Sequence, residues 1–175
     1  MARLGSPHSG AAYRVLFVCT GNICRSPLAE ALFIHDVEEK GLGHRFLADS
    51  AGLEGWHAGD RADPRTRRVA EGHGVPVPSI ARKFENHDFE RFDLILAMDR
   101  GHLAELQSRA PARYLDKVRL MRDHDQPEGR GKDVPDPYYG GPEGFESVHR
   151  LLARCCHNLL ESLEEEATAA PDSRP

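Results

Sequence analysis

Apolar runs alternate with amphipathic stretches along the middle of this chain. Four short runs rich in Val, Leu, Ile and Phe have the length and composition of buried strands. Between these runs, apolar residues recur at the spacing of a helix with one buried face. The pattern predicts strands at Val15–Val18, Phe46–Ser50, Leu94–Met98 and Val118–Met121. It predicts helices at Pro27–Lys40, Pro64–His73, Arg100–Ser108 and Pro142–Glu164, with a short helix near Asn86–Phe89.

The order of these elements predicts the fold class. Strands that alternate with helices are typical of a parallel sheet that is covered on both faces. We therefore predict a Rossmann-like α/β fold with a single domain, in which a central four-stranded parallel sheet has helices on both faces. The length of 175 residues suits one domain. We place this domain at residues 14–166, and we expect the small and polar residues of the ends, 1–13 and 167–175, to be disordered.

Composition narrows the choice of partners and location. The chain has 28 acidic and 23 basic residues and a net charge of −5, so we expect no basic surface for nucleic acid or an anionic membrane. No apolar run reaches the length of a signal-peptide core or of a transmembrane helix. The four cysteines do not have the pattern of a secreted disulfide framework. We expect a soluble, cytoplasmic protein whose partners are other proteins.

The loop after the first predicted strand has the residues of an oxyanion site. Cys19 follows four apolar residues, and Pro27 marks the start of the next helix. Gly21 and Asn22 adopt a positive φ at a lower cost than other residues, so the loop can curl with its backbone N–H groups pointing inward. Arg25 adds a planar guanidinium group that binds two phosphate oxygens at once.

Cys19 lies beneath this site as a candidate nucleophile. The helix start and Arg25 both favour the thiolate form of its side chain. Ser26 can donate a hydrogen bond to the thiolate or cap the helix, and both roles stay open. A buried structural cysteine is the alternative, but the Gly, Asn, Ser and Pro residues around it favour the catalytic interpretation. The loop lacks the Gly-Lys-Ser/Thr ending of a nucleotide-binding P-loop, which excludes that class.

A phosphate ester also needs a proton donor for its leaving oxygen. Asp136 lies between Pro135 and Pro137 in a Pro/Gly-rich stretch, so we expect its backbone to be extended and stiff. It is our candidate general acid, and an aspartate that only forms a turn is the alternative. This chemistry requires no metal ion or other cofactor.

Four segments of the chain resemble the low-molecular-weight protein tyrosine phosphatases. The loop from Cys19 to Ser26 is similar to the signature loop of that family, and it continues into residues 27–30 as theirs does. Three downstream segments match in the family's order: Asp49-Ser50-Ala51-Gly52, Ala97-Met98-Asp99 and Asp136-Pro137-Tyr138-Tyr139-Gly140. The resemblance runs from about Arg14 to Glu165. It implies a phosphotyrosine-protein phosphatase that hydrolyses phosphate monoesters through a phosphocysteine intermediate.

The resemblance implies a role for each matching residue. Cys19 would be the nucleophile, Arg25 would bind the phosphate, and Asp136 would act as general acid and then as general base. Ser50 and Asp99 would support the loop. The residues that would bind the substrate, with aromatic walls for a phenyl ring, are Thr20, Gly21, Asn22, Ile23, Cys24, Ser26, Trp56, Tyr138 and Tyr139. The partners would be phosphotyrosine-containing proteins. The oligomeric state stays open, and we favour a monomer.

Several of these residues keep a plainer interpretation. Trp56 can cover an edge of the core, Ser50 can satisfy a turn, and Asp99 can cap a helix. Cys24 can be a small packing residue, whereas the resemblance implies a reversible disulfide between Cys24 and Cys19.

Two segments leave questions open. Ser79 stands where many relatives have a histidine, which makes the support of the loop by this segment uncertain. The charged and Gly-containing residues 122–132 predict a mobile loop that leads to the candidate acid.

Three rival functions are disfavoured by particular residues. Thioredoxin-coupled arsenate reductases of this fold have relay cysteines near the middle of the chain, and residues 82–100 contain none. A phosphoprotein-binding module would lack the nucleophile or the acid, but both are present. Protein-arginine phosphatases have a threonine at the position of Ile23 and lack the tyrosine pair at 138–139. These features favour phosphotyrosine as the substrate.

Overall fold

Four parallel strands form the centre of the molecule. The structure is a computed structural model that describes residues 12–169. The strands are β1 (Tyr13–Cys19), β2 (Phe46–Gly52), β3 (Leu94–Ala97) and β4 (Val118–Leu120), and they lie in the order β2-β1-β3-β4. At the carboxyl end of the sheet, Cys19 pairs with Gly52 of β2 and Val18 pairs with Ala97 of β3. This arrangement confirms the predicted fold class.

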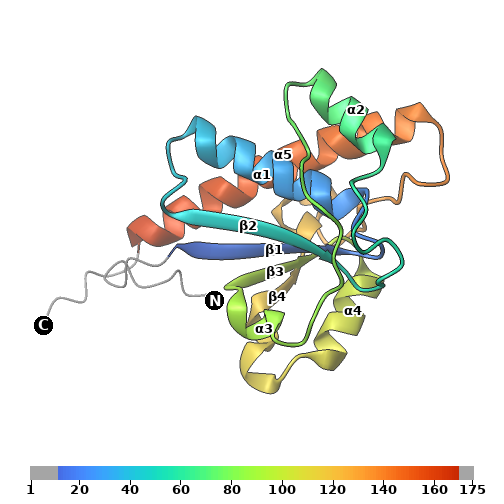
Figure 1. Cartoon of the computed structure of the whole chain (residues 1–175). Helices are drawn as coiled ribbons and strands as arrows, with labels where there is room; N and C mark the ends of the chain where they lie inside the picture. Colours follow the sequence, from blue (N-terminus) through green and yellow to red (C-terminus); the bar gives the residue numbers. More distant parts are fainter. Residues whose placement is uncertain (1–11, 170–175) are drawn as a thin grey trace, which may run out of the picture.

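Helices cover both faces of the sheet (Figure 1). The helices on one face are α1 (Arg25–Glu39) and α5 (Pro142–Ala169), with α2 (Pro64–Gly72) beside them. Those on the other face are α3 (Asp88–Arg91) and α4 (Arg100–Arg109). Alternate residues of β1 serve the two cores, because successive side chains of a strand point to opposite faces. Phe17 and Cys19 join the core under α1 and α5, whereas Leu16 and Val18 join the core under α3 and α4.

The switch in strand order determines where a ligand can bind. β1 is followed along the chain by β2 on one side and later by β3 on the other side. The connections that leave the carboxyl ends of β1 and β3 therefore diverge. In open α/β sheets, ligands bind in the crevice that such a divergence creates.

Helix α1 begins two residues earlier than predicted. The sequence placed Pro27 at the first helical position, but the helix starts at Arg25 and Pro27 is its third residue. The first four N–H groups of a helix have no partner within it, so a proline is accepted anywhere in this turn. The loop thus runs directly into the helix, and Arg25 belongs to both.

The regular elements also extend slightly beyond the predicted domain bounds of 14–166. Tyr13 is a buried residue of β1, and α5 continues to Ala169. These residues belong to the predicted tails 1–13 and 167–175, so at these positions the expectation of disorder is wrong. Hydrogen bonding of Tyr13 to Arg45 and the continuing helix hold these positions. The other tail residues, apart from Ala12, lie outside the described part of the chain.

The segment before the candidate acid is anchored rather than free. It contains two short 3₁₀ helices, η2 (Met121–His124) and η3 (Pro127–Gly129), which follow a third one, η1 (Ala112–Lys117). Asp125 is buried between them, where Arg122 lies 2.8 Å and Arg154 of α5 lies 2.7 Å from its carboxylate. The prediction of a mobile loop at residues 122–132 is therefore wrong, because an ion pair between the buried Asp125 and Arg154 ties this segment to α5. Among residues 12–169, no helix is long and apolar enough to cross a membrane.

Candidate active site

The loop of residues 19–26, which we call the anion loop, connects the end of β1 to the start of α1. Asn22 has a φ of 57°, as predicted for this position. Gly21 does not have the positive φ that we expected. Its lack of a side chain serves close packing instead, since a Cβ atom there would lie 3.0 Å from the ring of His57. Gly52 of β2 is required for a similar reason, because its Cβ would lie 2.8 Å from the carbonyl oxygen of Thr20.

The anion loop presents free backbone donors at a helix start. Within residues 12–169, we find no acceptor for the backbone N–H groups of Gly21 through Cys24. Successive unpaired N–H groups before a helix form a concave site for an anion. The anion loop therefore has the hydrogen-bond donors that a tetrahedral oxyanion needs.

Arg25 is held rigidly at the end of this loop. Its guanidinium group is buried, and its Nη1 atom donates to Asp99 Oδ2 at 3.1 Å and to the carbonyl oxygen of Val134 at 3.0 Å. The other carboxylate oxygen of Asp99 accepts the backbone N–H of His102 at 2.8 Å. Asp99 thus caps α4 and also orients Arg25. The two roles predicted for it, a helix cap and a support of the loop, occur together.

Cys19 lies at the base of the loop, within a buried set of polar groups. Its Sγ atom is 2.9 Å from Ser26 Oγ. The Nδ2 atom of Asn22 donates to Ser26 Oγ at 2.8 Å and to Ser50 Oγ at 2.9 Å, so Ser50 contacts the loop that the resemblance expects it to support. Ser26 does not cap the helix, because the N-cap residue is Cys24 and it makes no side-chain cap. Of the two roles left open for Ser26, the contact with the thiol is the one observed.

Asp136 uses its two carboxylate oxygens in different ways. Oδ1 accepts the backbone N–H of Tyr138 at 3.1 Å, which is the turn that the plainer interpretation predicts. Oδ2 lies 3.6 Å from Nη2 of Arg25, and the side chain is 45 % exposed. One oxygen therefore fixes the local backbone while the other faces the anion loop.

An open pocket of about 160 Å³ joins these groups. It is lined by Cys19, Thr20, Gly21, Ile23, Cys24, Arg25, Trp56, His57, Asp136, Tyr138 and Tyr139. Trp56 is 73 % exposed and Tyr139 is 91 % exposed, so neither covers an edge of the core. Of the residues predicted to bind the substrate, only Asn22 and Ser26 do not line the pocket. The side chains of these two loop residues are buried and bond to each other. Of the predicted supports, Ser50 bonds to Asn22 and Asp99 bonds to Arg25.

The pocket mouth is tied to α2 by Arg65, a residue that the sequence interpretation missed. Its Nη1 atom donates to the carbonyl oxygen of Tyr138 at 3.1 Å, and its guanidinium group lies over the rings of Tyr138 and Phe145. Asp63 holds the same guanidinium from the other side at 2.9 Å. The backbone N–H of Asp63 donates to Ile23 of the anion loop at 2.8 Å. Arg65 therefore links the segment of the candidate acid to the loop.

His102 is a second residue that the sequence did not single out. It is buried beneath the loop, where its Nε2 atom lies 2.7 Å from Thr20 Oγ1 and its Nδ1 atom lies 3.2 Å from Asp99 Oδ1. Burial lowers the pKa of His102 to about 4, so the ring is neutral at pH 7. The only signal in the sequence was its position three residues after a helix-capping aspartate. His57, next to Trp56 in the sequence, also lines the pocket and was not among the predicted site residues.

Cys24 lies in the pocket as a buried thiol. Burial, with a smaller contribution from Asp63, raises its pKa to about 12. Cys19, Cys24, Cys155 and Cys156 are all free of disulfide bonds. The thiol of Cys156 donates to the carbonyl oxygen of Ala29, which is a packing role within the core.

Backbone contacts also support the loop from the segment around Ser79. The N–H of Arg82 donates to Asn22 Oδ1 at 3.0 Å. The guanidinium group of Arg82 is held by Asp49 and Asp88, each at 3.0 Å. Support from this segment, which the serine at position 79 had put in doubt, is therefore supplied through Arg82.

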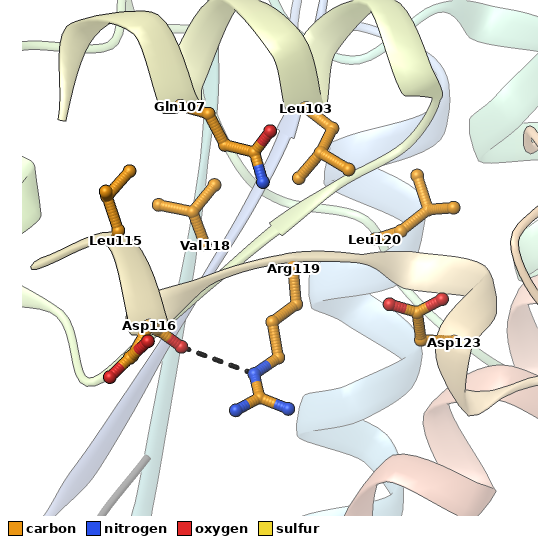
Figure 2. A pocket seen from close by; sticks show the side chains of 8 residues that line it. All are labelled: Leu103, Gln107, Leu115, Asp116, Val118, Arg119, Leu120 and Asp123. Atoms are coloured by element: carbon orange, nitrogen blue, oxygen red, sulfur yellow. Dashed lines mark hydrogen bonds between the residues drawn. The ribbon is translucent and has the colours of Figure 1, made fainter. Parts of the chain in front are cut away.

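A larger hollow of about 280 Å³ lies at the β4 edge of the sheet (Figure 2). Four apolar residues of α4, η1 and β4 line it together with the polar residues Gln107, Asp116, Arg119 and Asp123. Arg119 donates to the carbonyl oxygen of Asp116. Among the residues that the structure describes, no cysteine, serine or histidine side chain lines it, whereas the smaller pocket is lined by Cys19, Arg25 and Asp136.

The fold and this site together define a class of protein. A Cys-x₅-Arg loop at the carboxyl edge of a parallel α/β sheet, facing an aspartate, is the arrangement of a phosphatase-type domain. Comparison with known proteins specifies the family. The sequence profile described as low molecular weight phosphotyrosine protein phosphatase matches residues 14–169, and the chain belongs to this family.

Individual relatives agree with this assignment. The low molecular weight protein-tyrosine-phosphatase of Streptomyces coelicolor is 51 % identical over 156 residues, which are 88 % of this chain and 95 % of that protein. A crystal structure of a protein tyrosine phosphatase from Entamoeba histolytica, with Hepes in its active site, has a TM-score of 0.85 and 42 % identity. The match covers 89 % of this chain and 99 % of that one.

A relative with a different stated substrate has the same fold. The arginine phosphatase YwlE of Bacillus subtilis was solved as a cysteine-to-serine mutant with a phosphorylated active-site serine. It has a TM-score of 0.79 and 29 % identity, and the match covers 87 % of this chain and 96 % of that one.

Proposed function

We propose that this enzyme hydrolyses phosphotyrosine in proteins through a phosphocysteine intermediate. The observation that carries the proposal is the placement of three groups around one pocket. Cys19 lies at the base of the anion loop, Arg25 lies at the loop's end, and Asp136 faces Arg25 from the opposite segment. These are the groups that a nucleophile, an oxyanion clamp and a general acid require.

The first step transfers the phosphoryl group to the enzyme. The Cys19 thiolate attacks phosphorus, the P–S bond forms, and the P–O bond to the tyrosine breaks. Asp136 gives its proton to the leaving phenolate oxygen. Arg25 and the backbone N–H groups of the loop stabilise the charge on the three equatorial oxygens.

The second step releases phosphate and restores the enzyme. Asp136, now a carboxylate, takes a proton from a water molecule whose oxygen attacks phosphorus. The P–S bond breaks, and Cys19 leaves as a thiolate that Ser26 stabilises by a hydrogen bond. The phosphorylated serine of the YwlE mutant supports this route, because in that relative the residue in place of the cysteine carries the phosphoryl group.

The walls of the pocket support an aromatic substrate. Trp56 and Tyr139 are exposed at the mouth, and Tyr138 packs edge-on against Tyr139 with ring centroids 4.9 Å apart. Aromatic rings attract one another in such offset and edge-on arrangements. A phenyl ring attached to a phosphate in the loop would lie between these side chains.

Turnover of paired phosphopeptides tests this proposal. The kcat/KM for a phosphotyrosine peptide is compared with that for a phosphoarginine peptide of the same flanking sequence, with Cys19→Ser as the control. We expect at least a hundredfold preference for phosphotyrosine and no turnover by Cys19→Ser. Equal turnover of the two peptides would overturn the specificity, and an active Cys19→Ser variant would overturn the mechanism.

We also propose that Cys24 protects the nucleophile from permanent oxidation. Peroxide converts the Cys19 thiolate to a sulfenic acid, and Cys24 then attacks that sulfur with loss of water to form a disulfide. Both side chains line one pocket. The raised pKa of Cys24 slows its attack at neutral pH, because the thiolate is the attacking form.

Mass spectrometry after mild peroxide treatment tests this protection. We expect a Cys19–Cys24 linked peptide that forms faster at pH 9 than at pH 7, and recovery of activity with reductant. A Cys24→Ser variant that recovers as fully as the wild type would contradict the proposal.

The free cysteines also support a reducing, cytoplasmic location, which cell fractionation can test. We favour a monomer, and size-exclusion chromatography can test this oligomeric state.

A further inference from the structure

A buried carboxyl group lies behind the anion loop and is connected to its cysteine. Glu30 of α1 is 8 % exposed and accepts the hydroxyl proton of Ser50 at 3.0 Å. Ser50 is bonded to Asn22 at 2.9 Å, Asn22 to Ser26 at 2.8 Å, and Ser26 to Cys19 at 2.9 Å. Four consecutive hydrogen bonds therefore lead from the carboxyl group to the sulfur, all of them through buried side chains.

The direction of each proton in this chain follows from its donors. The N–H of Arg82 donates to Asn22 Oδ1, so the Nδ2 group of Asn22 must point the other way. Its two protons go to Ser50 Oγ and to Ser26 Oγ. Ser26 Oγ accepts one of these protons, and when Cys19 is a thiolate the Ser26 hydroxyl is the donor in its contact with Sγ. Ser50 likewise accepts from Asn22, so its own proton needs a separate acceptor, which the carboxyl group supplies.

Among the described residues 12–169, the charges that act on Glu30 do not include a cation that is free to pair with it. Arg82 is the basic residue whose charge lowers the pKa of Glu30, but its guanidinium group already bonds to Asp49 of β2 and to Asp88 of α3. Burial raises the pKa of Glu30 to about 7, and Asp49 adds to the shift, whereas Ser50, Ser79 and Arg82 oppose it. Both the acid and the carboxylate have an oxygen that can accept the Ser50 proton. The contact thus survives the change of charge.

We infer that Glu30 is a positioning residue for the reaction: it is the terminal acceptor that orders the hydrogen-bond chain and thereby aims the Ser26 hydroxyl at Cys19. The inference rests on the proposed role of Cys19 as nucleophile. Without the acceptor, the Ser50 hydroxyl would be buried with an unpaired proton. The hydroxyl would turn toward another acceptor, and this rotation would disturb the hydrogen bonds of Asn22. The Ser26 hydroxyl would then stabilise the thiolate less well, both at rest and as leaving group.

Three substitutions separate this role from a general structural one. Glu30→Ala removes the acceptor, Glu30→Gln keeps an acceptor oxygen without a charge, and Glu38→Ala removes an exposed acid from the same helix as a control. Two measurements are made on each variant. One is kcat and KM on a phosphotyrosine peptide, and the other is the pH dependence of Cys19 alkylation by iodoacetate, with the site identified by mass spectrometry.

The expected pattern is specific. Glu30→Ala lowers kcat about fivefold with little change in KM, and it moves the midpoint of Cys19 alkylation to higher pH. Glu30→Gln recovers most of both effects, and Glu38→Ala behaves like the wild type. A Glu30→Ala variant with the wild-type kcat and alkylation profile would overturn the inference. A Glu30→Gln variant as impaired as Glu30→Ala would also overturn it, because charge would then be the property that matters.

A second experiment covers the case in which Glu30→Ala does not fold, as judged by circular dichroism. Ser50→Ala breaks the chain one bond nearer to the cysteine and leaves the carboxyl group in place. Ser50→Ala should by itself lower kcat about fivefold and move the midpoint of Cys19 alkylation to higher pH, and a Ser50→Ala variant with the wild-type kcat and alkylation profile would contradict the inference. Because alkylation does not depend on turnover, these outcomes are distinct from a failure of the proposed phosphatase activity, which Cys19→Ser tests.

Discussion

At the scale of single residues, Asp136 is distinguished from its acidic neighbours by what its oxygens contact. Asp125 is buried between two arginines, and Asp133 is bonded to both the backbone and the side chain of Arg100. Asp136 has one oxygen in a turn and the other directed at Arg25. It is therefore the acid of this segment that is placed to reach a leaving group in the pocket.

We expect Asp136→Asn to slow poor leaving groups most. Loss of general acid catalysis costs about 10²- to 10⁴-fold, and a phenolate of tyrosine needs the proton early in its departure. An activated aryl phosphate needs it less, so its kcat/KM should fall much less. The measurement is kcat/KM, which reports the first step and not the hydrolysis of the phosphocysteine, for a series of aryl phosphates, with Asp133→Asn as the neighbouring control. A uniform loss across the series would leave Asp136 as a turn residue only.

The residues that the sequence could identify share one property. Cys19, Asn22 and Arg25 occur within seven positions, so their spacing alone defines a loop, and Asp136 is marked by its flanking prolines. Residues that act across long separations have no such signature. Thr20 and His102 are 82 positions apart, and only the folded chain brings their side chains to 2.7 Å. Local spacing therefore predicts the groups that we propose for the chemistry better than the groups that hold them.

At the scale of elements, the segment around Asp136 and Tyr138, which we call the acid segment, is positioned by helix α2, although no residue of α2 lines the pocket. The first turn of α2 contains Asp63, which caps the helix, and Arg65, which bonds to Tyr138. The same aspartate contacts the anion loop through its backbone. Movement of α2 would therefore alter the distance between the loop and Asp136.

We expect Arg65→Ala to lower kcat about tenfold without changing the affinity for inorganic phosphate. The substitution releases the acid segment but leaves the N–H groups of the anion loop and Arg25 intact, so only the positioning of Asp136 suffers. The measurements are kcat on a phosphotyrosine peptide and the inhibition constant of phosphate. Arg68→Ala, an exposed position of the same helix, is the matched control. Parallel losses of rate and phosphate affinity would show that Arg65 acts on the anion loop instead.

Element types were predictable where the periodicity was strong. All four strands and the four long helices lie within a few residues of their predicted positions, because burial on one or two faces determines their pattern. The errors occur where contacts that are distant in the sequence decide the outcome. Residues 122–132 are charged and contain glycines, which is typical of a mobile loop, yet Arg154 of α5 pairs with Asp125 and fixes them.

At the scale of the whole molecule, the stability of the fold depends on pH through a buried titratable group. The side of the sheet under α1 contains Glu30, which is buried near the carboxyl end of β2 and has its pKa raised to about 7. The unfolded chain releases this proton near pH 4.5. Between these two values, the folded state binds a proton that the unfolded state does not bind. The contribution of Glu30 to stability is therefore fully present below pH 4.5 and is lost as the pH rises through 7.

Glu30→Gln should accordingly stabilise the protein in a pH-dependent way. Glutamine has the shape of the neutral acid and cannot ionise, so it avoids the cost of burying a charge. A difference of two to three pKa units corresponds to about 3 kcal/mol, which is the upper bound of the gain expected above pH 8. Near pH 4.5 the gain should vanish. Urea unfolding midpoints of the wild type and the variant at several pH values measure this gap, with the exposed Glu38→Gln as control. A gap that stays constant from pH 5 to pH 8 would mean that Glu30 is already charged in the folded protein at pH 5. The stability of the folded protein and the positioning of Cys19 would then both depend on a buried carboxylate rather than on a neutral acceptor.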